Sequence, residues 1–190
     1  EQYDGSSWTE VGDLNTARYL ASKSSAGTSY SAALCISGAS PPVANVESWN
    51  GSAWTEIADV NTGRRGGGAG GTQTSSLLFG GAEPSISAKT ESWNGSSWTE
   101  VSDLNEGRED TGGGGASNTS AICAGGGDPS RSANVEVWDG SSWTEVSNLN
   151  AATYESPAVT GIASQALSMG GNVSGTNPGT AGKVEAYRRL

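Results

Sequence analysis

The sequence predicts an all-β fold built from four tandem repeats. One hairpin motif recurs at nearly constant spacing, and the same order of turn, small-residue and apolar segments follows it. The motif reads Trp-Asn-Gly-Ser-Ala-Trp-Thr-Glu at 49–56, with counterparts at 3–10, 93–100 and 138–145. Its second tryptophan falls at positions 8, 54, 98 and 143, giving steps of 46, 44 and 45 residues. Such regularity indicates a repeat architecture.

Each repeat begins with a turn and continues with four short strands. The turns contain Asp or Asn, which bond their own backbone at chain reversals; they lie at 13–18, 59–64, 103–108 and 148–153. Glycine-rich segments follow at 66–71 and 112–116. Because glycine suits places where backbones crowd together, we expect these segments to form the innermost strands.

The second strand of each repeat is predicted from a short apolar run that ends in glycine. These runs lie at 34–38, 77–81, 122–126 and 167–171, and loops of variable sequence follow them at 39–45, 82–89, 127–134 and 172–183. A third strand then enters a hairpin built on Asn-Gly or Asp-Gly, the strongest short hairpin signal. Four short strands joined by tight turns make one propeller blade.

The order Arg, apolar-Gly-Gly, Val-Glu-x-Tyr/Trp, Trp-Thr-Glu resembles the kelch repeat of galactose-oxidase-like propellers. The hairpin is shorter than in that family, and three copies carry Trp where the family has Tyr. The near-identity of neighbouring copies is also loosely similar to propeller arrays of phage tail and virion proteins. The resemblance implies a kelch-like β-propeller and an extracellular or virion-associated location, and the count of repeats predicts four blades.

We expect a single domain over 1–190. Blade 1 covers about 13–58, blade 2 about 59–102, blade 3 about 103–147 and blade 4 about 148–190. Blade 4 lacks an outer strand, which residues 1–12 can supply by pairing with 184–187. This pairing of N- and C-terminal strands closes the ring in a monomer and removes exposed sheet edges. The rival arrangement is one larger ring shared between two chains.

Composition excludes several partners. The formal charge is −10 and no basic stripe is visible, which disfavours nucleic acid and anionic membranes. No apolar run approaches the roughly 20 residues needed to span a bilayer, so we expect no membrane insertion. Hydrophobic content is low at 34%, but seven tryptophans at fixed register argue against disorder. The two cysteines occupy one register of alternate repeats, and we expect both to be free and buried.

The sequence offers little catalytic chemistry. It contains no histidine, so the resemblance carries over no copper site, and no Ser-His or Cys-His pair is available. Glutamates at 47, 91, 136 and 185 and arginines at 18, 64 and 108 recur with the repeat. A residue present in every repeat usually serves the repeat, so we interpret these as structural partners. We predict no enzyme activity, no metal site and no cofactor.

Positions where the repeats differ are the best candidates for binding. The residue after the arginine register varies between repeats, as does the next one. The resulting ligand-binding candidates are Tyr19, Arg65, Glu109, Asp110, Tyr154 and Glu155. In a propeller they share one face with the variable loops, and a rigid scaffold with dissimilar loops is a common design of binding modules.

Three functions remain open at this point. The first is a non-enzymatic module, of the adhesin or phage receptor-binding type, that binds a glycan or protein surface through this face. The second is a structural virion, appendage or scaffold subunit without a small ligand, in which case the loop variation is drift. A glycoside hydrolase has the least support, because no carboxylate pair departs from the repeat.

Overall fold

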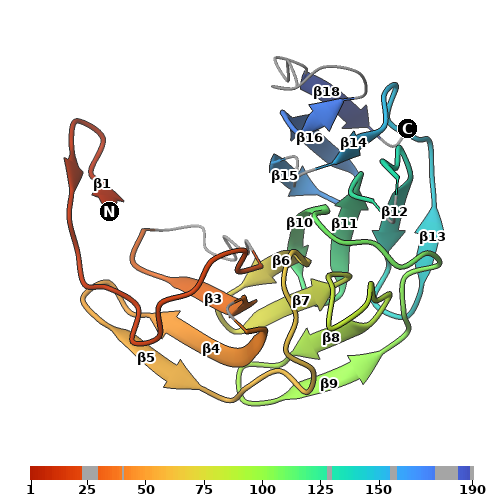
Figure 1. The fold of residues 1–190 in the computed structure, drawn as a ribbon. Coiled ribbons are helices and arrows are strands. Elements are labelled where there is room, and N and C mark those ends of the chain that lie inside the picture. The colour runs from red at the N-terminus through yellow and green to blue at the C-terminus, as the bar shows by residue number, and fades with distance from the viewer. Residues whose placement is uncertain (23–29, 40, 128–129, 155–157, 174–183, 189–190) are drawn as a thin grey trace.

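The computed structural model is all-β, and it describes every residue except 23–29, 40, 128–129, 155–157, 174–183 and 189–190. Its strands form six antiparallel sheets, four of which have three or four strands. Figure 1 shows these four standing side by side around an open arc. This is a propeller-like arrangement, in which each larger sheet packs face to face against the next.

The strands follow the chain from the inside of the arc outward. The first sheet has β3 (Ala33–Gly38), β4 (Val43–Trp49) and β5 (Trp54–Ile57). The second has β6 (Gly68–Thr72), β7 (Ser75–Phe79), β8 (Thr90–Trp93) and β9 (Trp98–Val101). The third has β10 (Gly112–Ser117), β11 (Ser120–Ala124), β12 (Val135–Trp138) and β13 (Trp143–Glu145). The fourth has β15 (Ala158–Ile162), β16 (Gln165–Met169) and β18 (Val184–Arg188).

Two small sheets complete the structure. One joins β14 (Thr153–Tyr154) to β17 (Asn172–Val173), and the other is the N-terminal hairpin of β1 (Gln2–Tyr3) and β2 (Trp8–Thr9). Within the described ranges, no helix has the length and apolar character to cross a bilayer.

The glycine-rich segments form the inner strands, as predicted. β6 and β10 are the first strands of their sheets and lie against each other. A Cβ at Gly70 would collide with the backbone of Gly114 on the neighbouring strand. Glycine is therefore required here because two backbones approach more closely than side chains allow.

The hairpins are built as the sequence predicts. In the second repeat, Trp93 pairs with Trp98 across β8 and β9, and their ring centroids lie 5.3 Å apart. The Asn94 side-chain oxygen accepts hydrogen bonds from the backbone nitrogens of Ser96 and Ser97, each at 2.9 Å. Asp4, Asn50 and Asp139 make the same turn in the other hairpins.

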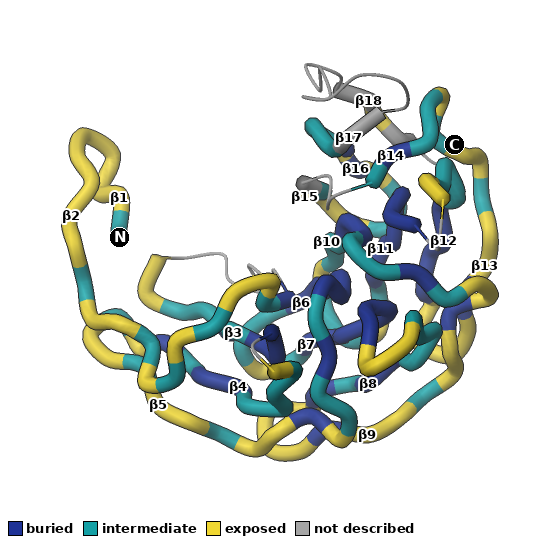
Figure 2. The backbone as a smooth tube through the Cα atoms, in the orientation of Figure 1, coloured by how far each residue is buried: buried dark blue, intermediate teal, exposed yellow. Residues whose placement is uncertain are grey.

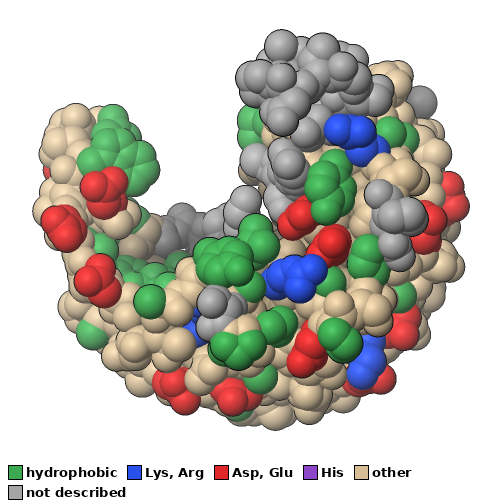
Figure 3. Space-filling view, viewed as in Figure 1, with side chains coloured by type: hydrophobic (Ala, Val, Ile, Leu, Met, Phe, Trp, Pro, Cys, Tyr) green, Lys and Arg blue, Asp and Glu red, His purple; other side chains and the backbone are tan. Residues whose placement is uncertain are grey.

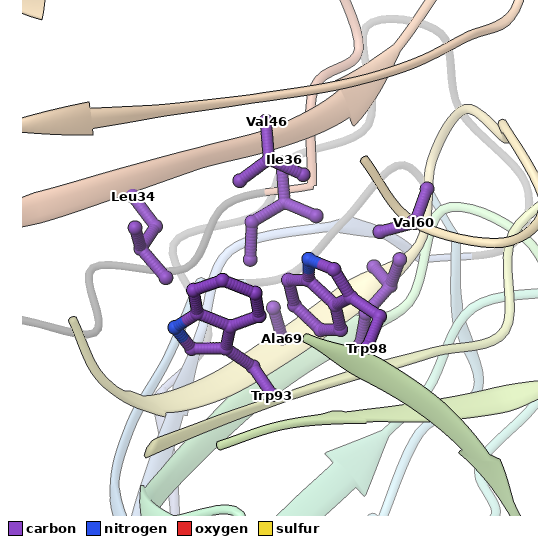
Figure 4. Packing of buried hydrophobic residues seen from close by; sticks show 8 residues of the cluster. Leu34, Ile36, Val46, Val60, Ala69, Trp93 and Trp98 are labelled. Carbon is purple, nitrogen blue, oxygen red and sulfur yellow. The ribbon is translucent and has the colours of Figure 1, made fainter. Parts of the chain in front are cut away.

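The second tryptophan of a hairpin fills the space between two sheets. Figure 4 shows Trp93 and Trp98 of the second sheet against Leu34, Ile36 and Val46 of the first sheet and Val60 of the turn that follows it. Trp143 of the third sheet packs in the same way, and it meets Phe79 edge-on with centroids 4.8 Å apart. The Trp98 and Trp143 indoles are 7% and 5% exposed, so the sheet interfaces hold the core. Figure 2 shows burial concentrated in the middle sheets and an exposed N-terminal hairpin.

The predicted closure of the ring is not formed in this chain. Residues 6–12 do not pair with 184–187; instead β2 pairs with β1, and β18 pairs with β16. Figure 1 shows the N-terminal hairpin across an open mouth from the fourth sheet. The packed interfaces fix the angle between neighbouring sheets, and the resulting arc leaves its ends apart.

The prediction for the cysteines is confirmed except for the burial of Cys35. Both cysteines are free thiols, and Cys123 is buried, but Cys35 is only partly buried. Burial raises the pKa of the Cys123 thiol, so it stays protonated at neutral pH and packs as a small apolar side chain.

Candidate functional site

Most of the predicted binding residues lie at one register of successive repeats on one face of the arc. Tyr19 bridges Ala39, Arg65 bridges Ala82, and Glu109 bridges Gly127 in matching antiparallel contacts. In the fourth repeat Tyr154 pairs with Asn172 in β14 and β17. Tyr19, Arg65, Glu109 and Tyr154 therefore lie beside the starts of the variable loops of their repeats. We call Tyr19, Leu20, Arg65, Glu109, Asp110 and Tyr154 the rim row; Glu155 lies outside the described residues.

The backbone under the rim row is tied from repeat to repeat. The amide of Gly38 donates to the carbonyl of Arg64 at 3.1 Å, and Gly81 donates to Arg108 at 2.8 Å. Gly126 donates to Thr153 at 3.0 Å in the same position. Each loop is thus bonded to the residue before the next rim position. A row fixed by backbone hydrogen bonds presents its side chains with little freedom to rearrange.

The side chains of the row differ in chemistry. Tyr19 is 61% exposed, and Arg65 donates to a Glu109 carboxylate oxygen at 3.3 Å in a half-exposed ion pair. Tyr154 is half-buried, with its ring beside Gly127. Figure 3 shows hydrophobic, basic and acidic side chains gathered along the inner rim of the arc. The row therefore offers an aromatic face together with donors and acceptors.

Backbone strain marks the second position of the row. Leu20, Gly66 and Asp110 share one register and have φ of +49°, +64° and +50°. Glycine and aspartate tolerate this left-handed region, whereas leucine does so at a cost. Leu20 is also 41% exposed, and its carbonyl accepts from Gly66 at 3.0 Å. A strained, exposed leucine suggests a functional constraint that the sequence pattern did not reveal.

Buried ion pairs lie beneath the row. Arg18 pairs with Glu47 at 3.0 Å and Arg64 with Glu91 at 2.9 Å, and Arg108 pairs with Glu136; all six side chains are buried. The predicted pairing of repeated arginines with repeated glutamates is confirmed in the first three repeats. Each ion pair joins two residues of one repeat, while the Arg64 and Arg108 carbonyls accept the bonds from the preceding repeat.

The Glu47 carboxylate also anchors the turn that starts its repeat. It accepts hydrogen bonds from the Asn15 backbone at 2.7 Å, the Asn15 side chain at 2.8 Å and the Thr16 backbone at 3.2 Å. Burial alone would raise the pKa of Glu47, but these bonds and Arg18 outweigh it and lower the pKa. This glutamate is therefore a charged structural anchor and not a proton donor.

A groove of about 350 Å³ lies on the inner side of the arc. The glycine-rich stretches of β6 and β10 line it, together with Val159–Ile162 of β15. Its walls are largely backbone, and the sequence predicted only a packing role for these glycines. Among the described residues, no group of three or more His, Cys, Asp or Glu is placed to hold a metal ion.

No family model matches the sequence, and no curated protein matches it. A solved structure titled "Structure of YjhT" is similar in fold, with a TM-score of 0.58 at 15% identity. The fold resembles that of YjhT. The similarity covers 75% of this chain and 48% of the YjhT chain, so this chain spans about half of YjhT's length. At this identity the likeness concerns the fold alone.

Proposed function

We propose that this protein is a non-enzymatic binding module and that the rim row binds a glycan. The observation that carries the proposal is the placement of unlike side chains at one register above a repeated, hydrogen-bonded backbone. Where a repeat keeps its backbone and varies its outward side chains, variation concentrated at one face favours recognition.

The chemistry of the row suits a sugar. The exposed Tyr19 ring offers a flat apolar face to the C–H face of a pyranose, and Leu20 extends that surface. Arg65 adds hydrogen-bond donors and Glu109 adds acceptors, and the two groups lie side by side, 3.3 Å apart. A protein surface is the competing target. We further propose that the four larger sheets are kelch-like blades, which the order of repeat motifs supports.

The test compares binding of the wild type with that of Tyr19→Ala and Arg65→Ala on a glycan array, with a protein pull-down in parallel. Tyr30→Ala is the matched control, because Tyr30 is 64% exposed and precedes the opposite end of β3. The proposal expects a glycan signal that both rim variants lose and Tyr30→Ala keeps. A signal that survives both rim variants, or empty results in both assays, contradicts it.

A structural subunit is the second candidate. The exposed hairpin at one end of the arc and the outer edge of β18 at the other end favour this role. An assembly in which neighbouring subunits cover the rim row would support this candidate over glycan binding.

A further inference from the structure

The third interface of the arc contains a cavity where the first two contain a tryptophan. The cavity measures about 200 Å³ and lies between the third and fourth sheets. Apolar side chains on both sides line it: Ile122, Ala124 and Val135 of the third sheet and Leu149 of the turn that follows it face Val159 and Ala166 of the fourth sheet. We call this cavity the socket.

The lining of the socket corresponds, position by position in the repeat, to residues that pack against tryptophan in the first interface. Ile122, Ala124, Val135 and Leu149 occupy the repeat positions of Leu34, Ile36, Val46 and Val60. Those four residues pack with Trp93 and Trp98 in the first interface (Figure 4). Ser147 also lines the socket and stands at the register of Ala58, whose carbonyl accepts the Trp98 indole N–H at 3.1 Å.

The apolar clusters of the three interfaces also differ in whether they contain tryptophan. The first cluster contains Trp93 and Trp98, and the second contains Trp138 and Trp143. The described members of the third cluster are aliphatic, and none is aromatic. The fourth sheet also lacks the outer strand that carries the tryptophan in the second and third sheets.

Trp8 belongs to none of these apolar clusters. Trp8 is 67% exposed, and it stands at the repeat position of Trp98 and Trp143. Its hairpin is already in the conformation of the buried ones. The Tyr3 and Trp8 rings lie 5.3 Å apart at 37°, against 5.3 Å and 34° for Trp93 and Trp98. Hydrogen bonds from Ser6 and Ser7 to Asp4 hold its turn.

We propose that the socket binds Trp8 of a second copy of this chain. The hairpin cannot serve its own socket without closing the arc, because it lies across the mouth from the fourth sheet (Figure 1). Closing the arc would change the angles between neighbouring sheets. The packing of Trp98 and Trp143 and the close approach of Gly70 to Gly114 fix these angles. This inference uses no residue of the rim row and does not depend on glycan binding.

The first test is the mass of the wild type as a function of concentration, measured by analytical ultracentrifugation. The proposal expects a mass that rises above the 19.1 kDa of one chain. Trp8→Ala removes the inserted side chain, and Ala166→Leu fills the socket; each is expected to stay at one chain mass. Ala186→Leu is a second blocking variant at an exposed position of the socket wall, for use if Ala166→Leu fails to fold. Tyr30→Ala is expected to associate like the wild type.

The decisive test mixes two variants that do not associate alone. Trp8→Ala keeps an open socket, and Ala166→Leu keeps an intact hairpin, so together they form one contact. The proposal expects a species of two chains in the mixture only. A wild type that stays at one chain mass at every concentration overturns it, as does a mixture that stays at one chain mass while the wild type associates.

Discussion

Arg64 and Glu91 form an ion pair of 2.9 Å in which both side chains are fully buried. Arg65, the next residue, pairs with Glu109 on the half-exposed rim at 3.3 Å. Two adjacent arginines of one turn thus place the same kind of contact in two environments.

Removing the buried Arg64 is expected to lower the free energy of unfolding far more than removing the half-exposed Arg65. Arg64→Ala leaves Glu91 charged and buried, which costs about 3–5 kcal/mol of unfolding free energy. Arg65→Ala is expected to cost about 1 kcal/mol or less, because the Glu109 carboxylate left behind keeps partial access to water. Urea unfolding of the two variants measures the difference. Equal losses would contradict the structural role of the buried pairs.

Acid is expected to weaken the anchor at Glu47. The pKa of Glu47 is lower in the folded chain than in the unfolded one, so the folded state favours the charged form. Its contribution is complete above the unfolded pKa of about 4.3 and is lost as the pH falls toward the folded pKa. Urea midpoints of the wild type and Glu47→Gln, measured from about pH 6 to about pH 3, are therefore expected to converge. A gap that stays constant with pH would contradict this.

A methyl group at Gly70 is expected to separate β6 from β10. Gly70→Ala places a Cβ against the Gly114 backbone, which cannot move without shifting the whole strand. We expect a loss of about 1–3 kcal/mol, as for overpacked sites. Gly12→Ala is the control, because its Cβ would meet its nearest neighbours at 3.7 Å. Thermal unfolding compares the two, and similar melting temperatures would refute the close approach.

Trp143 and Trp8 are expected to differ strongly in what they contribute to one chain. Trp143 is buried, meets Phe79 and donates its indole N–H to the Thr90 hydroxyl at 3.0 Å. Trp143→Ala is expected to cost about 3–5 kcal/mol. Trp8→Ala, measured at a concentration where chains stay single, is expected to change stability by less than about 0.5 kcal/mol. Denaturant titration at two protein concentrations separates this effect from association.

Local features of the fold could be predicted because they depend on short stretches. The Asn94 turn, the glycine strand around Gly70 and the pairing of Arg64 with Glu91 follow from residue type and register. The ends of the arc could not be predicted, since the angle between sheets is set by packing along whole interfaces. The backbone strain at Leu20 and the socket beside Ala166 could not be predicted either, because both depend on the three-dimensional arrangement of the chain.

The backbone hydrogen bonds that join Gly38 to Arg64, Gly81 to Arg108 and Gly126 to Thr153 connect only consecutive repeats. Cooperativity in such an array passes from neighbour to neighbour, so the units at either extremity have one flank without support. Native-state hydrogen exchange should accordingly be slowest in β7 and β11 and accelerate toward both termini. A gene duplication that inserts one more copy of 59–102 would lengthen the array without disturbing the contacts already present.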